Sequence, residues 1–168
     1  MESLTTPRLV LLPLGPERAR RLVDGVVGPG ERGADGYPDA GDRAGAERYL
    51  RVLAGSGDPA PYGAYEIQRR ADGLLIGGAG FHGPPGADGR VTVGYGLVPA
   101  ARGHGYATEA LRALLEHARR HGAAGVAGDT DRENTGSQRV MAAAGMRPVG
   151  EDARLRYYAV TWAAAESS

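Results

Sequence analysis

The sequence contains no cysteine and no lysine, and only one phenylalanine and one tryptophan. The lack of cysteine excludes disulfide bonds, thiolate metal ligands and a cysteine nucleophile, and it fits a reducing compartment. The basic residues are therefore 20 arginines, which balance 20 acidic residues to a formal net charge of zero. Sequence-independent nucleic-acid binding needs a broad positive field. We therefore expect no nucleic-acid partner.

Long hydrophobic runs are also absent. The best run, Leu9 to Leu12, stops at Pro13, whereas a membrane span needs roughly 20 apolar residues. We expect a soluble, cytoplasmic protein without a membrane partner. A chain of 168 residues has the size of one domain, so we expect a single domain over 1–168 with a frayed tail at about 163–168.

Hydrophobic periodicity predicts an α/β fold with the order β-α-α-β-β-β-α-β-α-β-β. The predicted strands are 8–14, 64–68, 74–81, 90–98, 126–130 and a closing pair from 149 to 162, and the predicted helices are 17–23, 46–53, 106–121 and 135–144. Turn-forming segments separate the three central strands, which indicates an antiparallel meander.

A long loop is predicted between Gly25 and Gly45, because this segment holds seven glycines and two prolines. Its charged residues are Glu31, Asp35, Asp39 and Asp42 against Arg32 and Arg43, so two minus four gives a net charge of −2. Two interpretations stay open. The loop is either an acidic lid over a substrate or a solvated surface loop with incidental charge.

The strongest local signal lies between 98 and 109, where a strand passes into the best predicted helix. Gly103 and Gly105 permit a tight turn, and the helix that follows offers unpaired N–H groups at its positive end. Such a turn can hold a phosphate, and Arg102 adds a charge suited to a pyrophosphate. A plain strand-to-helix connection with a surface arginine is the alternative.

Two nucleotide-binding motifs fit this turn poorly. A P-loop requires a Gly-Lys-Ser/Thr sequence, which a chain without lysine cannot supply. A Rossmann motif would need a third glycine where Thr108 stands and a second βαβ half that the remaining chain is too short to form.

The sequence Arg102-Gly103-His104-Gly105-Tyr106-Ala107 resembles the acyl-CoA pyrophosphate loop of the Gcn5-related N-acetyltransferases (GNAT). Asn134 to Ser137 is similar to the Asn-x-x-Ser of the ribosomal-protein N-terminal acetyltransferase branch. The resemblance implies a mixed, strongly twisted sheet with helices on both faces and acetyl-CoA as cosubstrate. It also implies an amine acceptor, either a peptide N-terminus or a small molecule. The cofactor-binding residues that it implies are Leu97, Val98, Arg102, Gly103, His104, Gly105, Tyr106, Ala107, Asn134 and Ser137.

The chain departs from the family at two positions. Thr92 stands where many relatives carry a glutamate base, and Met141 stands where a tyrosine protonates the leaving thiolate. The resemblance to the ribosomal branch therefore assigns Ser137 as the acid that protonates the thiolate. For the role of the base, the ionisable candidates near the expected substrate cleft are His82, Glu66 and Asp129. No metal-site spacing is present. A catalytically degenerate acyl-CoA sensor is the alternative function, and a homodimer is one option for the assembly.

Overall fold

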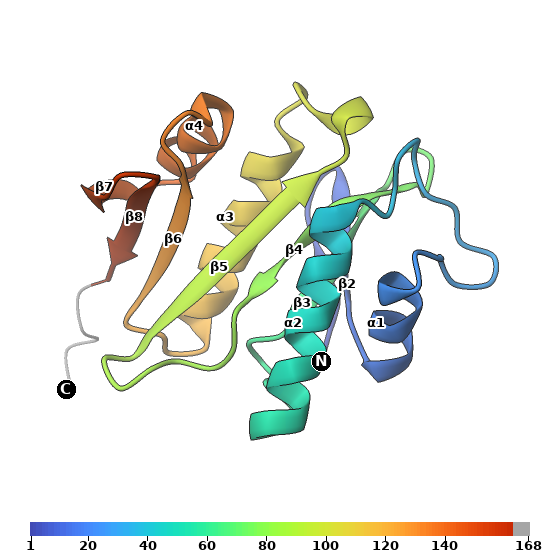
Figure 1. Cartoon of the computed structure of the whole chain (residues 1–168), viewed down its shortest axis with the longest axis horizontal. Helices are drawn as coiled ribbons and strands as arrows, with labels where there is room; N and C mark the ends of the chain where they lie inside the picture. Colours follow the sequence, from blue (N-terminus) through green and yellow to red (C-terminus); the bar gives the residue numbers. More distant parts are fainter. Residues whose placement is uncertain (163–168) are drawn as a thin grey trace.

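The computed structural model describes residues 1–162 (Figure 1). The predicted frayed tail at 163–168 lies outside these residues. Within the described part of the chain, eight strands form one sheet. Their spatial order is β1 (Leu4–Thr5), β2 (Leu9–Pro13), β3 (Ala64–Arg69), β4 (Leu75–Phe81), β5 (Arg90–Leu97), β6 (Gly125–Asp131), β8 (Leu155–Thr161) and β7 (Arg147–Glu151). The predicted antiparallel meander of β3, β4 and β5 is confirmed.

Among residues 1–162, β5 and β6 are the one parallel pair of the sheet, and the sheet opens between them. Pairing there covers only Arg90–Thr92 against Gly125–Ala127. Beyond Thr92 the two strands diverge, and Figure 1 shows the gap widening toward their carboxyl ends. The gap leaves backbone groups of both strands without a ladder partner, which is the feature that positions the site.

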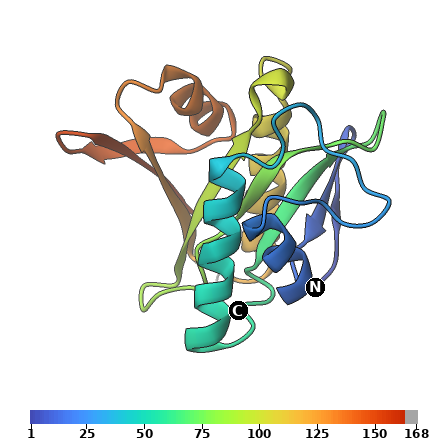
Figure 2. The same ribbon diagram turned by 45° about the vertical axis from the view of Figure 1, so that its right-hand side comes forward.

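Helices cover both faces of the sheet, as predicted. On one face lie α1 (Pro16–Val23) and α2 (Ala40–Ser56), and on the other lie α3 (Tyr106–Arg120) and α4 (Thr135–Ala143). Figure 2 shows α1 and α2 in front of the sheet, while β7, β8 and α4 lean away from the strands before the gap. The larger core lies between α3 and the sheet, and a smaller one lies between the sheet and the pair α1 and α2.

The start of α2 differs from the prediction, which extended the preceding loop to Gly45. The helix begins at Ala40, because Asp39 and Asp42 form a capping box in which each side chain accepts the other's backbone N–H. Gly41 and Gly45 conceal this start in the sequence, since glycine is a poor helix former. The shortened loop is also tied to β4, as Ala34 donates to the Leu75 carbonyl.

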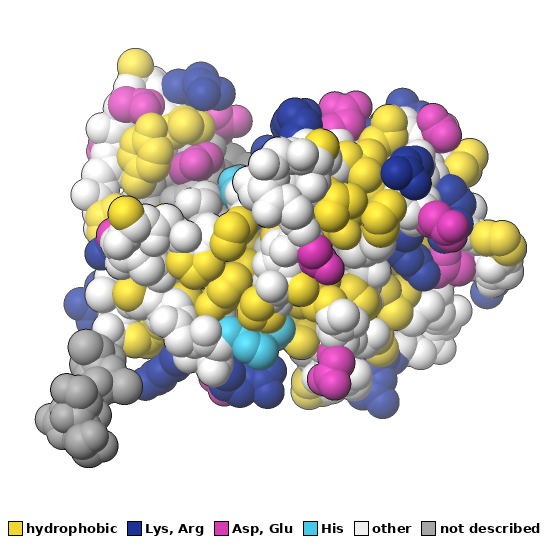
Figure 3. Space-filling view, turned by 90° about the horizontal axis from the view of Figure 1, so that it is seen from below, with side chains coloured by type: hydrophobic (Ala, Val, Ile, Leu, Met, Phe, Trp, Pro, Cys, Tyr) yellow, Lys and Arg dark blue, Asp and Glu magenta, His cyan; other side chains and the backbone are white. Residues whose placement is uncertain are grey.

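Two short elements were not predicted: the two-residue β1 and a 3-10 turn at Pro99–Ala101. Neither is long enough to show a hydrophobic period. The expected order of the longer elements is confirmed. Acidic and basic side chains are interspersed over the face seen in Figure 3, in keeping with the balanced charge. Among residues 1–162, no helix has the length and apolar character to cross a membrane.

Candidate functional site

A cavity of about 460 Å³ opens on the face covered by α1 and α2 and continues into the gap between β5 and β6. Its floor includes alternate glycines of two strands, Gly78 and Gly80 on β4 and Gly94 and Gly96 on β5. Side chains from α2 form one wall, and residues of α4 close the far end. The cavity therefore connects the two faces of the sheet through the gap.

The register of β4 and β5 determines which backbone groups of β5 point into the gap. His82 donates its backbone N–H to Thr92, and Val98 donates to Ile76, so the even-numbered residues of β5 pair with β4. The odd-numbered residues after Thr92, namely Val93, Tyr95 and Leu97, therefore turn their N–H and C=O groups toward β6. Of the two predicted cofactor-binding residues at the end of this strand, Leu97 turns toward the gap, whereas the backbone N–H and C=O of Val98 are both paired within the protein.

The opposite side of the gap follows the same rule. Arg132 donates its N–H to Arg154 beyond the end of β8, so the even-numbered residues of β6 pair with β8. The backbone of Asp129 therefore faces β5. A ligand with amide groups can pair with both strands in this gap, in the manner of an added strand.

At the upper end of the gap, the turn from β5 to α3 has the geometry of an anion site. Gly103 and Gly105 have φ of +85° and +81°, in the left-handed region that favours glycine. No side chain caps the start of α3 at Gly105, so the N–H groups of its first turn are unpaired by the protein. Arg102 lines the cavity and donates Nε to the Leu97 carbonyl at 3.1 Å.

Ser137 contacts two residues at the start of α4. Its backbone N–H donates to Asn134 Oδ1 at 3.0 Å, which caps the helix. Its hydroxyl lies 2.9 Å from that of Tyr95, and the Tyr95 hydroxyl also donates to the Ser137 carbonyl at 3.2 Å. Burial raises the pKa of Tyr95, which keeps it protonated near neutral pH. Asn134 does not line the cavity, whereas Ser137 and Tyr95 do.

Sequence reasoning did not identify Tyr95. The available signal was its position on β5, three residues beyond the last paired residue of the parallel ladder, which turns its backbone into the gap. Of the two positions at which the sequence departs from the pattern that it resembles, Thr92 is outside the cavity lining, and Met141 is buried against the cavity's far end.

Glu66 lies at the cavity's other end and is only 2% exposed. One carboxylate oxygen accepts from Arg18 at 2.7 Å, and the other accepts a short hydrogen bond from the Tyr37 hydroxyl. Arg18 also binds Glu31 at 2.8 Å. Both carboxylate oxygens of Glu66 are thus held by side chains of the protein.

Two other titratable groups line the cavity closer to its glycine floor. Burial raises the pKa of Asp42 to about 7, and the charges of Asp39 and Glu66 add to this rise. The Oδ1 atom of Asp42 lies 3.2 Å from the position that a Cβ on Gly78 would take, so Asp42 borders the glycine floor. Partial removal from water, with the charge of Arg48, lowers the pKa of His82, and Asp129 opposes this shift. Near pH 7 His82 is therefore neutral.

Most of the predicted site residues meet around this cavity. Leu97, Arg102, Ser137, His82 and Glu66 line it, and the turn 103–107 follows directly after Arg102. Asp35, predicted as part of an acidic lid, is exposed and outside the lining, whereas Asp39 and Asp42 belong to the wall formed by α2.

Comparisons with known proteins give one family for this arrangement. Residues 8–147 match the profile of the acetyltransferase (GNAT) domain. No curated protein matches the chain.

Solved structures share the fold over nearly the whole chain. A protein from Bordetella pertussis assigned to the GnaT acetyltransferase family has a TM-score of 0.69 and 24% identity, with 95% of this chain and 99% of that chain covered. The ribosomal-protein-S5-alanine acetyltransferase from Vibrio fischeri has a TM-score of 0.69 and 13% identity, with coverage of 96% and 97%. RimL, the ribosomal L7/L12 α-N-protein acetyltransferase solved with coenzyme A, has a TM-score of 0.68 and 16% identity, with coverage of 95% and 98%.

Proposed function

Because the chain belongs to the GNAT acetyltransferase family, we propose that it transfers the acetyl group of acetyl-CoA to a primary amine. The amine is the N-terminal α-amine of a protein or that of a small molecule. The observation that supports this most is the continuity of one cavity from the gap between β5 and β6 to a wall of carboxylates. Donor and acceptor can thus meet from opposite ends.

Acetyl-CoA would occupy the gap and the turn above it. The pyrophosphate fits the N–H groups of Gly103 to Ala107 and the charge of Arg102. The amides of the pantetheine arm fit the unpaired backbone of Tyr95 and Asp129 and the free N–H of Leu97 across the gap, since the Leu97 carbonyl accepts from Arg102. An N–H of β5 in the gap would then stabilise the negative oxygen that develops on the thioester carbonyl.

The acceptor would enter from the side of α2. Asp39 and Asp42 line this part of the cavity together with Arg48, while Glu66 is paired with Arg18. The two carboxylates against one guanidinium favour a cationic amine over an anionic acceptor. An α-amine has a pKa of about 7.7–8.0, against about 10.4 for a lysine side chain, so far more of it is neutral near pH 7.5. The proposal therefore favours α-amines, which need only a weak base.

In the chemical step the neutral amine nitrogen attacks the thioester carbon, and the C–S bond breaks as the tetrahedral intermediate collapses. The departing thiolate takes a proton from the Ser137 hydroxyl, which the Tyr95 hydroxyl can replace through their hydrogen bond. The proton lost by the amine passes to Asp42 or to neutral His82, both in the cavity lining. Glu66 instead holds Arg18 and Tyr37 in place.

The test is a panel of amines with acetyl-CoA as donor. The panel contains peptides with a free α-amine, the same peptides acetylated at the N-terminus but carrying lysine, and small primary amines. We expect CoA release and a mass gain of one acetyl group with free α-amines, and much less with lysine. Cofactor binding without any amine-dependent CoA release would instead indicate an acyl-CoA sensor.

A second experiment asks whether Asp42 accepts the proton of the amine. If it does, kcat/KM of the wild type rises as Asp42 ionises near pH 7, and Asp42→Asn should lose this rise. An unchanged pH profile in Asp42→Asn would exclude Asp42 from that role.

A further inference from the structure

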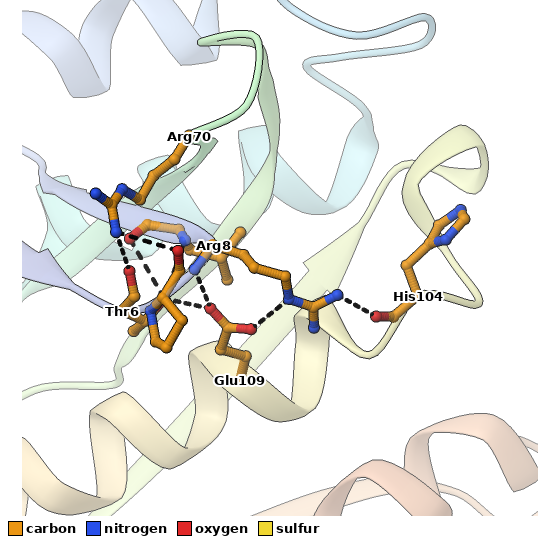
Figure 4. Close-up of polar contacts among 7 residues, drawn as sticks. Thr6, Arg8, Arg70, His104 and Glu109 are labelled. Atoms are coloured by element: carbon orange, nitrogen blue, oxygen red, sulfur yellow. Dashed lines mark hydrogen bonds and ion pairs between the residues drawn. The ribbon is translucent and has the colours of Figure 1, made fainter.

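Arg8, at the end of the segment before β2, contacts the turn that would hold the pyrophosphate (Figure 4). Its Nη1 donates to the carbonyl of His104 at 2.7 Å. Its guanidinium also lies over the ring of Tyr106, 4.5 Å from the centroid. A residue distant in sequence thus holds the backbone of the turn at His104.

The carbonyl of His104 and the N–H of Gly105 belong to one planar peptide unit, in which the two groups point in opposite directions. Because Arg8 holds the carbonyl, the N–H of Gly105 points away from Arg8. Within residues 1–162 this N–H has no hydrogen-bond partner. It is therefore a donor with a fixed direction and no partner in the protein.

Glu109, in the first turn of α3, fixes Arg8 in this position (Figure 4). Its Oε1 accepts from Arg8 Nε at 2.7 Å, and its Oε2 accepts from the Arg8 backbone N–H at 2.9 Å and from the Thr6 hydroxyl. Burial would raise the pKa of Glu109, but these hydrogen bonds outweigh it and hold the pKa below its usual value. Glu109 therefore stays charged near neutral pH and offsets the charge of Arg8.

We propose that Arg8 is a positioning residue for acetyl-CoA. Held by Glu109, it orients the peptide between His104 and Gly105 so that the Gly105 N–H faces the pyrophosphate. This inference rests on the proposed function, because it requires acetyl-CoA to bind at this turn. Arg8 acts through the turn and not as a ligand of the phosphates, since its charge is already paired with Glu109.

The test compares Arg8→Met with Arg70→Met. Methionine keeps an apolar stem and removes both donors of Arg8. Arg70 is the matched control, because it belongs to the same cluster and donates to the carbonyls of Thr6 and Pro7 but has no hydrogen bond to the turn among the described residues. Binding of CoA and of dephospho-CoA, which keeps the pyrophosphate but lacks the 3′-phosphate, is measured by calorimetry. Initial rates are measured with acetyl-CoA and with acetyl-pantetheine, which lacks the pyrophosphate.

We expect Arg8→Met to raise the Kd of CoA and of dephospho-CoA by a similar factor, about ten-fold or more, as expected for a well-oriented hydrogen bond to a charged group. The rate with acetyl-pantetheine should change little, and Arg70→Met should bind CoA as the wild type does. A merely structural defect would impair the acetyl-pantetheine reaction as well, and a direct contact to the 3′-phosphate would spare dephospho-CoA. Either result would overturn the proposal.

A second variant, Glu109→Gln, keeps the volume of the side chain but weakens its hold on Arg8. It should raise the Kd of CoA by a smaller factor with the same ligand pattern, and unchanged binding in both Arg8→Met and Glu109→Gln would reject the positioning role. Failure of the wild type to bind CoA would instead contradict the proposed function itself.

Discussion

The hydroxyl of Ser137 has a second hydroxyl, that of Tyr95, at 2.9 Å. A serine hydroxyl is a very weak acid, and the phenolic hydroxyl of Tyr95 is a stronger one even though burial raises its pKa. A proton that passes from Tyr95 to Ser137 as Ser137 protonates the thiolate would lower the cost of that step. Two residues from different elements, β5 and α4, would then share the role that the sequence indicated for Ser137 alone.

Replacing either hydroxyl separates this role from cofactor binding. We expect Ser137→Ala and Tyr95→Phe each to lower the single-turnover rate of acetyl transfer, with about a hundred-fold loss for Ser137→Ala, and to leave the Kd of CoA nearly unchanged. The double variant should lose little more than Ser137→Ala, because the two groups act in one path. Multiplicative losses would show that they act separately, and a wild-type rate in Ser137→Ala would leave the serine only its contact with Tyr95.

At the scale of elements, local patterns were sufficient for α3 and for the turn before it. Two glycines, an arginine and a regular apolar stripe within 102–118 predict a helix that begins at an anion site, and α3 begins at Tyr106 as expected. The patterns failed where a contact is distant in sequence. Arg8 and Glu109 are 101 residues apart, and neither has a local feature that indicates the other.

The error at α2 has a different cause, because the signal there was local. Its capping box was readable at Asp39 and Asp42, but the glycine-rich composition around it favoured a loop. The cavity itself was predictable only in part. The resemblance to the GNAT family indicated the turn 102–107 and Ser137, whereas the proximity of Tyr95 to Ser137 and of Tyr37 to Glu66 depends on packing between elements.

The glycine floor of β4 and β5 offers a test of the acceptor half of the cavity. A Cβ at Gly96 would meet no atom within 4 Å, and its φ is not in the left-handed region, so Gly96→Val should fold and fill space in the cavity. We expect a several-fold rise in the KM of the amine and little change in the KM of acetyl-CoA. The measurement is steady-state kinetics with each substrate varied in turn.

Gly80 is the matched position on the same face of the sheet. A Cβ there would lie 2.7 Å from the Ala64 Cα, so Gly80→Ala should lower stability and Gly96→Ala should not. Equal melting temperatures for the two alanine variants would contradict this description of the floor. For the kinetic test, a rise in the KM of acetyl-CoA alone in Gly96→Val would show that the amine does not bind beside Gly96.

For the molecule as a whole, the balanced charge removes long-range effects of one sign, so the response of stability to pH depends on individual buried groups. His117 on α3 is one of them, at 5% exposure. Its Nε2 lies 2.6 Å from the Pro61 carbonyl, while its Nδ1 is buried without a partner among the described residues. Neutral His117 donates from Nε2, and protonation would add a buried Nδ1–H with no acceptor.

Burial therefore lowers the pKa of His117 below its unfolded value of about 6.5, and the nearby His121 and Arg120 act in the same direction against the hydrogen bond to Pro61. The unfolded chain then binds more protons than the folded one as the pH falls through about 6.5, so the free energy of unfolding decreases with acidity. We expect this group to lower the free energy of unfolding by up to about 1.4 kcal/mol per pH unit below pH 6.5.

The variant His117→Gln keeps a donor for the Pro61 carbonyl but cannot titrate. It should be less stable than the wild type at pH 7.5, and its free energy of unfolding should fall by less between pH 7.5 and 5.5. His82 and Asp42 are present in both proteins, so their contributions cancel when the free energy of unfolding of the variant is subtracted from that of the wild type at each pH. Parallel losses of stability in urea denaturation across this range would show that His117 does not carry the dependence.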